Sequence, residues 1–330
     1  MLPIKCRIYL FTYDRNNLLE RAVNSLLAQT FTNWICEVHN DLPGNNFPGN
    51  YIQSLNDERF TVINHPVNLG PTASFNLAFN GCDEKYVSIL EDDNWWEPGF
   101  LQEMIYIMET HNTIDVSWSN MRIWKENEDH TWLDTQKTIW PSGNNILFDW
   151  PHPKQALGAL YSNGAMIYKG VMAKKYQIPQ NVLFNAMEMV RERCFEHPIY
   201  LVSKPLANFS FTIKSSQSNN GIKWTGAQIM MLASYIGNSE NKKNEFINLL
   251  KYNQNSKPST IPVFFLSVIF YTKDYRLLYY FNISDWLKII RWCLRNVFNV
   301  FLLKSYLKSQ YQTWCFLKEC TPVIPSNDTI

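Results

Sequence analysis

The chain has 330 residues, 46% of them hydrophobic, which is sufficient for one large domain or for a domain with an appendage. Its formal net charge is +1, so no overall field marks a nucleic-acid-binding protein, and we expect no nucleic-acid partner. The seven cysteines form no CxxC pair, which is typical of free thiols in a reducing cytoplasm. The first residues run directly into an apolar strand pattern, so we expect no signal peptide.

The first part of the chain alternates between strand and helix patterns. Apolar residues at helical spacing predict an amphipathic helix over 18–29, with Asn17 and Glu20 as its capping box, and a shorter helix over 72–79. Short apolar runs predict strands at 6–12, 34–38, 60–64 and 86–90. Alternation of this kind implies a largely parallel sheet with right-handed crossovers.

Three adjacent carboxylates, Glu91, Asp92 and Asp93, follow the strand at 86–90 and precede two tryptophans and a helix that starts near 97–99. Like charges at this spacing repel one another, so the cluster needs a compensating cation. Mg²⁺ and Mn²⁺ take oxygen ligands and are commonly shared with substrate phosphates. Ligands of open α/β sheets bind at the carboxyl ends of the strands. An exposed acidic turn is the alternative, but the position between a strand and large aromatics favours a metal site.

The segment YVSILEDDNWWEPGFLQEM resembles the metal-binding segment of glycosyltransferase family 2. That family has an apolar strand, an Asp-x-Asp motif and then Pro-Gly-Phe-Leu. Glu91 takes the place of the first Asp here, so the match is Glu91, Asp92 and Asp93.

Two further segments carry the same resemblance across the first half of the chain. FTYDRNNLLERAVNSLLAQTFTNWICEVHND is similar to the family's opening segment, although Asp14 stands where Asn is usual and Asn40 where the first of two Asp is usual. NHPVNLGPTASFNLAF is similar to its Asn-x-Gly segment, with Asn68, Gly70 and Asn76 in place.

The resemblance implies a GT-A fold, an α/β Rossmann-like and mostly parallel sheet flanked by helices, here with a C-terminal helical appendage. It implies an inverting, hexosyltransferase-type enzyme that moves a sugar from a nucleotide-diphosphate sugar to a glycan or lipid-linked glycan in surface polysaccharide synthesis. It assigns Mg or Mn to Asp93 and Glu91, and the nucleobase to Asp41. The donor-binding set that it implies is Thr12, Tyr13, Asp14, Asp41, Asn68, Asn76 and Asp92.

Transfer of this kind also needs a base, because an acceptor hydroxyl is a weak nucleophile. The family has a catalytic carboxylate at the position of Glu188, within a helix predicted over 184–193, and Glu192 is the competing candidate. The other interpretation of Glu188 is an exposed helical residue paired with Arg191. One base and one displacement imply inversion at the anomeric carbon.

Two other functions fit parts of the pattern. A nucleotidyltransferase shares the α/β sheet and the acidic metal site, but it would need a glycine-rich phosphate loop, which 11–14 does not provide. A nucleotide-sugar-binding GT-A module without catalysis is the second alternative, and the presence of both Asp93 and Glu188 argues against it.

The middle of the chain is less regular. Strands are predicted over 113–124 and 165–168, and again over 199–204 and 206–212, with a polar, irregular segment at 125–149. The tryptophans of this region suit contacts with an acceptor sugar or pin the loop in place, and the sequence leaves both open. They are Trp132, Trp140 and Trp150.

We expect a catalytic domain over 1–215 and a helical region over 216–330, joined by a polar loop or lid at 215–221. The stretch 282–320 has no Pro or Gly, which favours a long helix, and it is basic and rich in Trp and Phe. Such helices lie in membrane interfaces, and no apolar run is long enough to span a bilayer. The sequence therefore predicts a cytoplasmic protein, peripheral at the inner face of the cell membrane, and the resemblance implies a glycan or polyprenyl-linked acceptor. A helix packed on the protein is the alternative.

Overall fold

The computed structural model describes residues 5–141, 143–159, 162–213 and 221–325. The chain divides into two compact units, and each draws on several segments of the sequence. The first unit is Met1–Asp149, Tyr161–Gln177 and Phe195–Ser216, and the second is Trp150–Leu160, Ile178–Cys194 and Gln217–Ile330. Most of the loop predicted at 215–221 lies outside the described residues.

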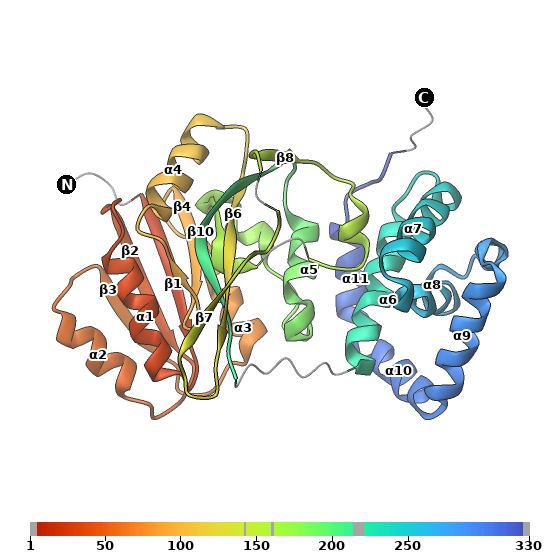
Figure 1. Ribbon diagram of the computed structural model, residues 1–330, viewed down its shortest axis with the longest axis horizontal. Coiled ribbons are helices and arrows are strands. Elements are labelled where there is room, and N and C mark those ends of the chain that lie inside the picture. Colours follow the sequence, from red (N-terminus) through yellow and green to blue (C-terminus); the bar gives the residue numbers. More distant parts are fainter. Residues whose placement is uncertain (1–4, 142, 160–161, 214–220, 326–330) are drawn as a thin grey trace. The chain divides into compact units, whose positions relative to one another are not determined.

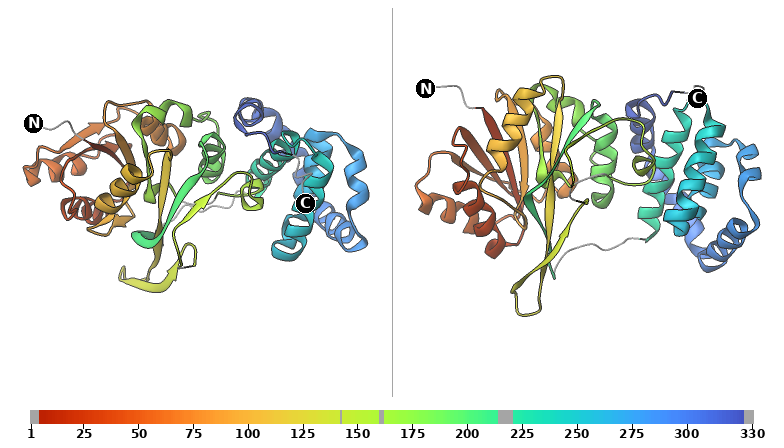
Figure 2. Two further views of the ribbon diagram at one scale, coloured as in Figure 1. Left: turned by 90° about the horizontal axis from the view of Figure 1, so that it is seen from above. Right: turned by 45° about the horizontal axis from the view of Figure 1, so that its top comes forward.

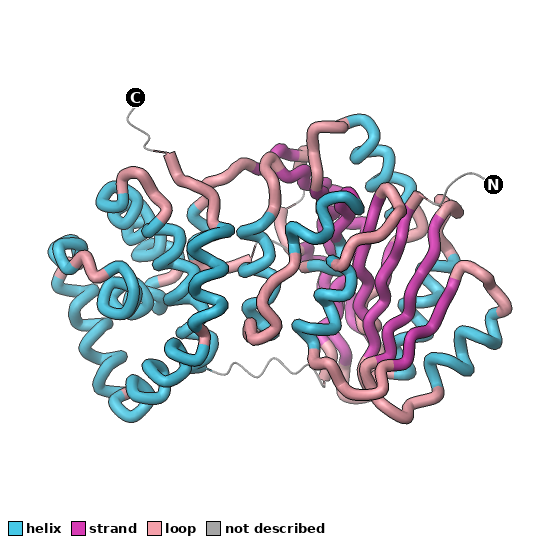
Figure 3. Tube along the Cα trace, turned by 180° about the vertical axis from the view of Figure 1, so that it is seen from behind, coloured by secondary structure: helices cyan, strands magenta, loops and turns pink. Residues whose placement is uncertain are grey.

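A mixed sheet forms the centre of the first unit, in the order β3-β2-β1-β4-β9-β6-β10-β5 (Figures 1 and 3). Its strands are β1 (Cys6–Thr12), β2 (Trp34–Asn40), β3 (Phe60–Asn64), β4 (Tyr86–Glu91), β5 (Trp95–Trp96), β6 (Val116–Glu126), β7 (Trp132–Thr138), β8 (Ile146–Phe148), β9 (Met166–Lys169) and β10 (Ile199–Phe211). The pairs among β1 to β4 are parallel, as the strand–helix alternation predicted. β9 is antiparallel to both of its neighbours, β4 and β6.

Helices cover both faces of this sheet (Figures 2 and 3). They are α1 (Asn16–Leu27), α2 (Phe47–Leu55), α3 (Pro71–Asn76) and α4 (Phe100–Thr110). The capping box predicted for α1 is wrong, because the helix begins before Asn17 and its N-cap residue is Arg15, without a side-chain capping bond. The amides of Leu18 and Leu19 bond instead to the Arg15 carbonyl oxygen.

The segment predicted as irregular between 125 and 149 contains the end of β6 and two further strands, β7 and β8, which corrects the prediction. β6 extends to Glu126, and β7 turns back to pair with it through a tight turn at Asn127–His130. His130 has φ of 62°, in the left-handed region that closes the turn. β10 is one long strand whose register shifts around Pro205, which has no N–H to donate to the ladder.

The second unit is helical in its described part (Figure 1). Its α-helices are α5 (Met187–Arg191), α6 (Gly221–Gly237), α7 (Lys242–Ser256), α8 (Ile261–Ser267), α9 (Ile283–Arg295), α10 (Val297–Ser309) and α11 (Tyr311–Cys320). The buried Arg193 guanidinium lies 5.0 Å from the Trp150 ring and 5.1 Å from the Tyr235 ring, and it donates to the Gln155 carbonyl. Through Arg193, the segment around Trp150 packs against Tyr235 of α6.

The single long helix predicted over 282–320 is wrong, because the chain breaks at Asn296 and Gln310. Asn296 leaves helical geometry and its side chain donates to the Trp292 carbonyl oxygen at 2.8 Å. Asparagine bonds to the backbone in this way at the expense of regular helix. Among the described residues, no helix combines the length and apolarity needed to cross a membrane.

Candidate active site

The parallel strands deliver the predicted polar residues to one edge of the sheet. In the ladder, Thr12 at the end of β1 is opposite Asn40 of β2, and Phe11 is opposite Glu91 of β4. The backbone continues this pairing past the strand ends, because the Asp41 amide donates to Thr12 O at 3.1 Å and the Asp92 amide to Phe11 O at 3.0 Å. The predicted donor residues at 12, 41 and 92 therefore lie together.

Asp92 is the most enclosed carboxylate of this edge, with 4% of its surface exposed. Its Oδ2 accepts from the Thr12 hydroxyl at 2.8 Å and from the Tyr13 amide at 3.1 Å. Burial, together with the charge of Asp93, raises the pKa of Asp92 to about 7, although Arg15 and these hydrogen bonds act in the opposite direction. The surroundings of Asp92 therefore disfavour its charged form, mainly because the carboxyl is buried.

Asp93 is half-buried and forms an ion pair with Arg15, whose guanidinium also lies 3.4 Å from Asp92 Oδ1. Burial raises the pKa of Asp93, and the Arg15 charge opposes this shift. Arg15 thus occupies the position of a counter-ion between the two carboxylates. Sequence reasoning missed it because nothing local in the sequence indicates a partner 78 residues away.

A second arginine holds the backbone of the acidic turn. Arg21 on α1 donates to the Asp93 carbonyl oxygen at 2.7 Å, and its guanidinium carbon lies 3.9 Å from the centre of the Trp95 ring and 4.0 Å from that of the Trp132 ring. These two rings meet edge to face, and the two cation–π contacts hold the guanidinium. Trp132, left open between an acceptor contact and a packing role, is in this structure part of the packing around Asp93.

Glu91 turns away from this ion-paired group toward the interior of the unit. Its Oε2 accepts from the Asn94 side chain, and Gly164 lies so close that an added Cβ would be 2.9 Å from that oxygen. Within the described part of the chain, no group of three or more His, Cys, Asp or Glu side chains is arranged to hold a metal ion. Mg²⁺ is often bound through one or two carboxylates plus substrate phosphates, and the Asp93 oxygens fit that requirement.

The remaining predicted donor residues lie on the segments that follow β1, β2 and β3 and on α3. Asp41 is buried, and its Oδ1 accepts from the Leu69 amide at 2.8 Å. Asn68 is exposed and caps a turn, with its Oδ1 accepting from the Gly70 amide at 2.7 Å. Asp14 is exposed with φ of 53°, and Asn76 is half-buried at the end of α3.

Glu188 and Glu192 belong to the second unit. Glu188 is half-buried in the first turn of α5, whereas Glu192 is 3% exposed. Arg191 and Arg193 on either side of Glu192 are buried as well. Of the two candidate bases, Glu188 is therefore the more accessible to a substrate.

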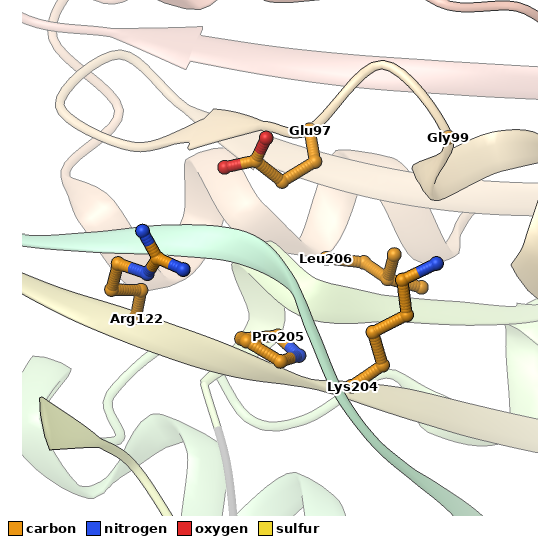
Figure 4. A pocket seen from close by; sticks show the side chains of 6 residues that line it. All are labelled: Glu97, Gly99, Arg122, Lys204, Pro205 and Leu206. Carbon is orange, nitrogen blue, oxygen red and sulfur yellow. The ribbon is translucent and has the colours of Figure 1, made fainter. Parts of the chain in front are cut away.

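A pocket of 360 Å³ lies on the first unit beside β5 and β10 (Figure 4). Its lining residues are Glu97, Gly99, Arg122, Lys204, Pro205 and Leu206. Lys204 is paired with Glu103 at 2.7 Å, and none of the predicted donor or metal residues lines the pocket. It is thus separate from the acidic edge.

Solved structures of TarS from S. aureus have a similar fold. The crystal structure of residues 1–349 gives a TM-score of 0.59 at 15% identity and covers 93% of this chain and 92% of that chain. Its complex with UDP-GlcNAc gives a TM-score of 0.53 at 13% identity, covering 96% and 90%. The fold is that of a GT-A glycosyltransferase, and the predicted fold class is confirmed.

Sequence comparison finds relatives of the sheet-bearing part of the chain. Residues 8–167, slightly less than half of the chain, match the model of Glycosyl transferase family 2. A protein of Escherichia coli K12 named as a colanic acid biosynthesis glycosyl transferase, WcaA, is 33% identical over 95 residues. The match covers 28% of this chain and 34% of that protein, about a third of its length.

Proposed function

We propose that this protein is an inverting glycosyltransferase that moves a sugar from a nucleotide-diphosphate sugar to a glycan or lipid-linked glycan during polysaccharide synthesis. One observation carries the proposal: Thr12, Asp41, Asp92 and Asp93 gather at the carboxyl ends of β1, β2 and β4 within the segment that matches family 2. The name of WcaA and the TarS complexes with UDP and UDP-GlcNAc support the same class of reaction.

The nucleoside would be held by groups that the sheet edge already positions. Asp41 is fixed through Oδ1, and its Oδ2 makes no hydrogen bond to a described residue, so a nucleobase N–H can donate to it. Tyr13 is 52% exposed and offers a ring face for stacking. The turn at Asn68, Gly70 and the end of α3 at Asn76 complete the proposed donor set.

Asp93, assisted by Glu91, would hold Mg²⁺ or Mn²⁺ together with the donor diphosphate. When bound, the ion neutralises the charge of the leaving diphosphate. The chain's own part is to present the Asp93 oxygens, which Arg21 fixes through the backbone and Arg15 neutralises before the donor binds. Asp92, held by Thr12 and Tyr13, keeps the turn in register with β1.

The acceptor hydroxyl must lose its proton as the new bond forms, and we assign this step to Glu188. Its partial exposure suits a group that meets a substrate, whereas the buried Glu192 would first have to be uncovered. The proton goes to the Glu188 carboxylate, the hydroxyl oxygen bonds to the anomeric carbon, and the nucleoside diphosphate leaves from the opposite side.

The test is a transfer assay on Glu188→Gln with a nucleotide sugar selected by its stabilisation of the protein. Turnover should fall about 10²- to 10⁴-fold with donor affinity unchanged, since the lost group acts only on the acceptor proton. Glu319→Gln, an exposed carboxylate of the same unit, should keep wild-type turnover. Normal turnover in Glu188→Gln with loss of turnover in Glu192→Gln would move the role of base to Glu192. Formation of a nucleotide sugar from a nucleoside triphosphate and a sugar 1-phosphate, with release of pyrophosphate, would indicate a nucleotidyltransferase.

A further inference from the structure

The outer face of α9 carries a stripe of exposed apolar side chains. Ile283, Leu287, Ile290 and Leu294 follow one another at intervals of four, three and four residues, which places them on one side of the helix. They are 81%, 62%, 51% and 72% exposed. Exposed apolar residues scattered singly are ordinary, but a continuous stripe of them marks an interaction surface.

The opposite side of α9 is packed against the rest of the second unit, which fixes the direction of the stripe. Ile289 is buried, and the Trp286 ring lies 5.9 Å from Phe265 and 5.7 Å from Phe281. The buried Asp285 accepts from the Gln254 side chain at 2.5 Å and caps the helix start. α9 is therefore packed against the second unit through this side, and the apolar stripe on its other side is exposed.

Exposed apolar side chains continue after the break at Asn296, on α10, the next helix along the chain in Figure 1. Leu303 and Leu307 are buried in the unit. The exposed apolar side chains of this helix are Val297, Phe298, Phe301 and Leu302. We refer to these four and the four of α9 as the α9–α10 surface.

Positive charge accompanies the α9–α10 surface. Arg291, Arg295, Lys304 and Lys308 are exposed, and none of them has an ion-pair partner among the described residues. The acidic residue of these two helices, Asp285, is buried and lies 3.7 Å from Lys288. A partner for this surface must accept apolar side chains and cations side by side.

We propose that the α9–α10 surface binds an anionic lipid bilayer, with α9 and α10 in the interface. The apolar stripe would lie at the boundary of head groups and acyl chains, and the four cations at the lipid phosphates. A second copy of the chain fits poorly, because pairing the same surface would bring the arginines of both copies together. Anionic lipid occurs at the inner face of the cell membrane. The lipid-linked acceptor of the proposed function would be reached there, yet lipid binding itself does not depend on glycosyl transfer.

The test is co-sedimentation of the full chain with vesicles of phosphatidylcholine alone or with 30% phosphatidylglycerol. Wild type should bind the anionic vesicles at low salt, and binding should fall at least tenfold as salt rises. Two double variants, Leu287→Gln/Leu294→Gln and Arg291→Gln/Arg295→Gln, test the apolar stripe and the cations. Each should bind the anionic vesicles at least tenfold more weakly than wild type. Val171→Gln, which removes an even more exposed apolar side chain from the first unit, should bind like wild type.

Wild type that stays in the supernatant, or stripe variants that sediment like wild type, would overturn the proposal. A concentration-dependent dimer that Leu287→Gln/Leu294→Gln abolishes would show that a second copy covers the surface instead. Nucleotide-sugar binding, measured on the same samples by calorimetry, should be equal in all variants. If wild type binds no nucleotide sugar, the proposed transferase function fails. The vesicle experiment would still decide whether the α9–α10 surface binds lipid.

Discussion

Arg15 is the residue through which the metal assignment can be tested without an activity assay. Its guanidinium pairs with Asp93 and approaches Asp92, so Arg15→Gln leaves two adjacent carboxylates with less compensation. We expect a loss of about 1–3 kcal/mol in the free energy of unfolding. MnCl₂ should raise the melting temperature of this variant more than that of wild type, because the ion replaces the lost charge.

The control is Arg276→Gln, which removes an exposed arginine paired with Asp274 in the second unit. Surface pairs of this kind contribute little, so its melting temperature and Mn²⁺ response should match wild type. Equal Mn²⁺ responses in wild type and Arg15→Gln would mean that no ion binds beside Asp93.

Gly164 is predicted to control the position of Glu91. A Cβ at this position would lie 2.9 Å from Glu91 Oε2 and 3.3 Å from Asn94 Nδ2, so Gly164→Ala must displace both side chains. We expect the free energy of unfolding, measured by urea denaturation, to fall by about 1–3 kcal/mol, because the added methyl group overpacks the buried interior. Gly143→Ala meets nothing within 4 Å and should be neutral, whereas a neutral Gly164→Ala would show that Glu91 moves freely.

At the residue scale, the sequence predicts site residues that follow directly from a strand end, but it does not predict partners that are far apart along the chain. Asp92 and Asp93 follow directly from a strand and its carboxyl end, and Thr12 joins them because parallel strands align their ends. Arg15 and Arg21 could not be predicted as partners of this turn, since their contacts bridge more than 70 residues and depend on how α1 docks. Ligand contacts of Asp14 and Asn68 stay predictions.

At the element scale, β1 and β2 contain a titratable group that should make stability depend on pH. His39 is buried, with its ring 5.3 Å from Phe11 and 5.3 Å from His65. Burial, with a smaller effect of His65, lowers the pKa of His39 to about 4. Glu37, 3.4 Å from Nε2, is engaged by Arg7 and does not offset this.

The sign follows from proton uptake. An unfolded histidine takes up a proton below its ordinary pKa of 6.5, and the folded one only near 4, so the unfolded state binds more protons in between. As pH falls from 7 to 4.5, the free energy of unfolding of wild type should therefore decrease. This decrease should be about 1–3 kcal/mol larger than the decrease in His39→Phe. Urea denaturation at both pH values measures this, and parallel losses in the two proteins would contradict the burial argument.

Elements with strong local patterns were predictable, and those defined by their neighbours were not. β1, β3 and β4 have bounds within a residue of the predicted runs. β1 and β4 are buried apolar segments, and β3 is a short run whose first residue, Phe60, is buried. β7 was missed because it is polar and half-exposed and exists through pairing with β6. The breaks at Asn296 and Gln310 were missed because the absence of Pro and Gly does not exclude a side chain that bonds to the backbone.

At the scale of the molecule, the predicted α/β first part and helical second part both exist, but the chain passes between them more than once. The segments 150–160 and 178–194 belong to the helical unit through contacts such as Arg193 with Trp150 and Tyr235. A division made along the sequence at residue 215 could not represent such an exchange, since it depends on which unit each segment packs against.

The most direct test of the whole account is calorimetric titration of a panel of nucleotide sugars into the protein with and without Mn²⁺. At least one should bind wild type in an Mn²⁺-dependent manner, and Asp93→Asn, which keeps shape but removes charge, should bind it at least tenfold more weakly. Asp83→Asn, an exposed carboxylate before the other end of β4, should bind like wild type. A folded wild type that binds no nucleotide sugar, or an Asp93→Asn variant with unchanged affinity and metal response, would contradict the account.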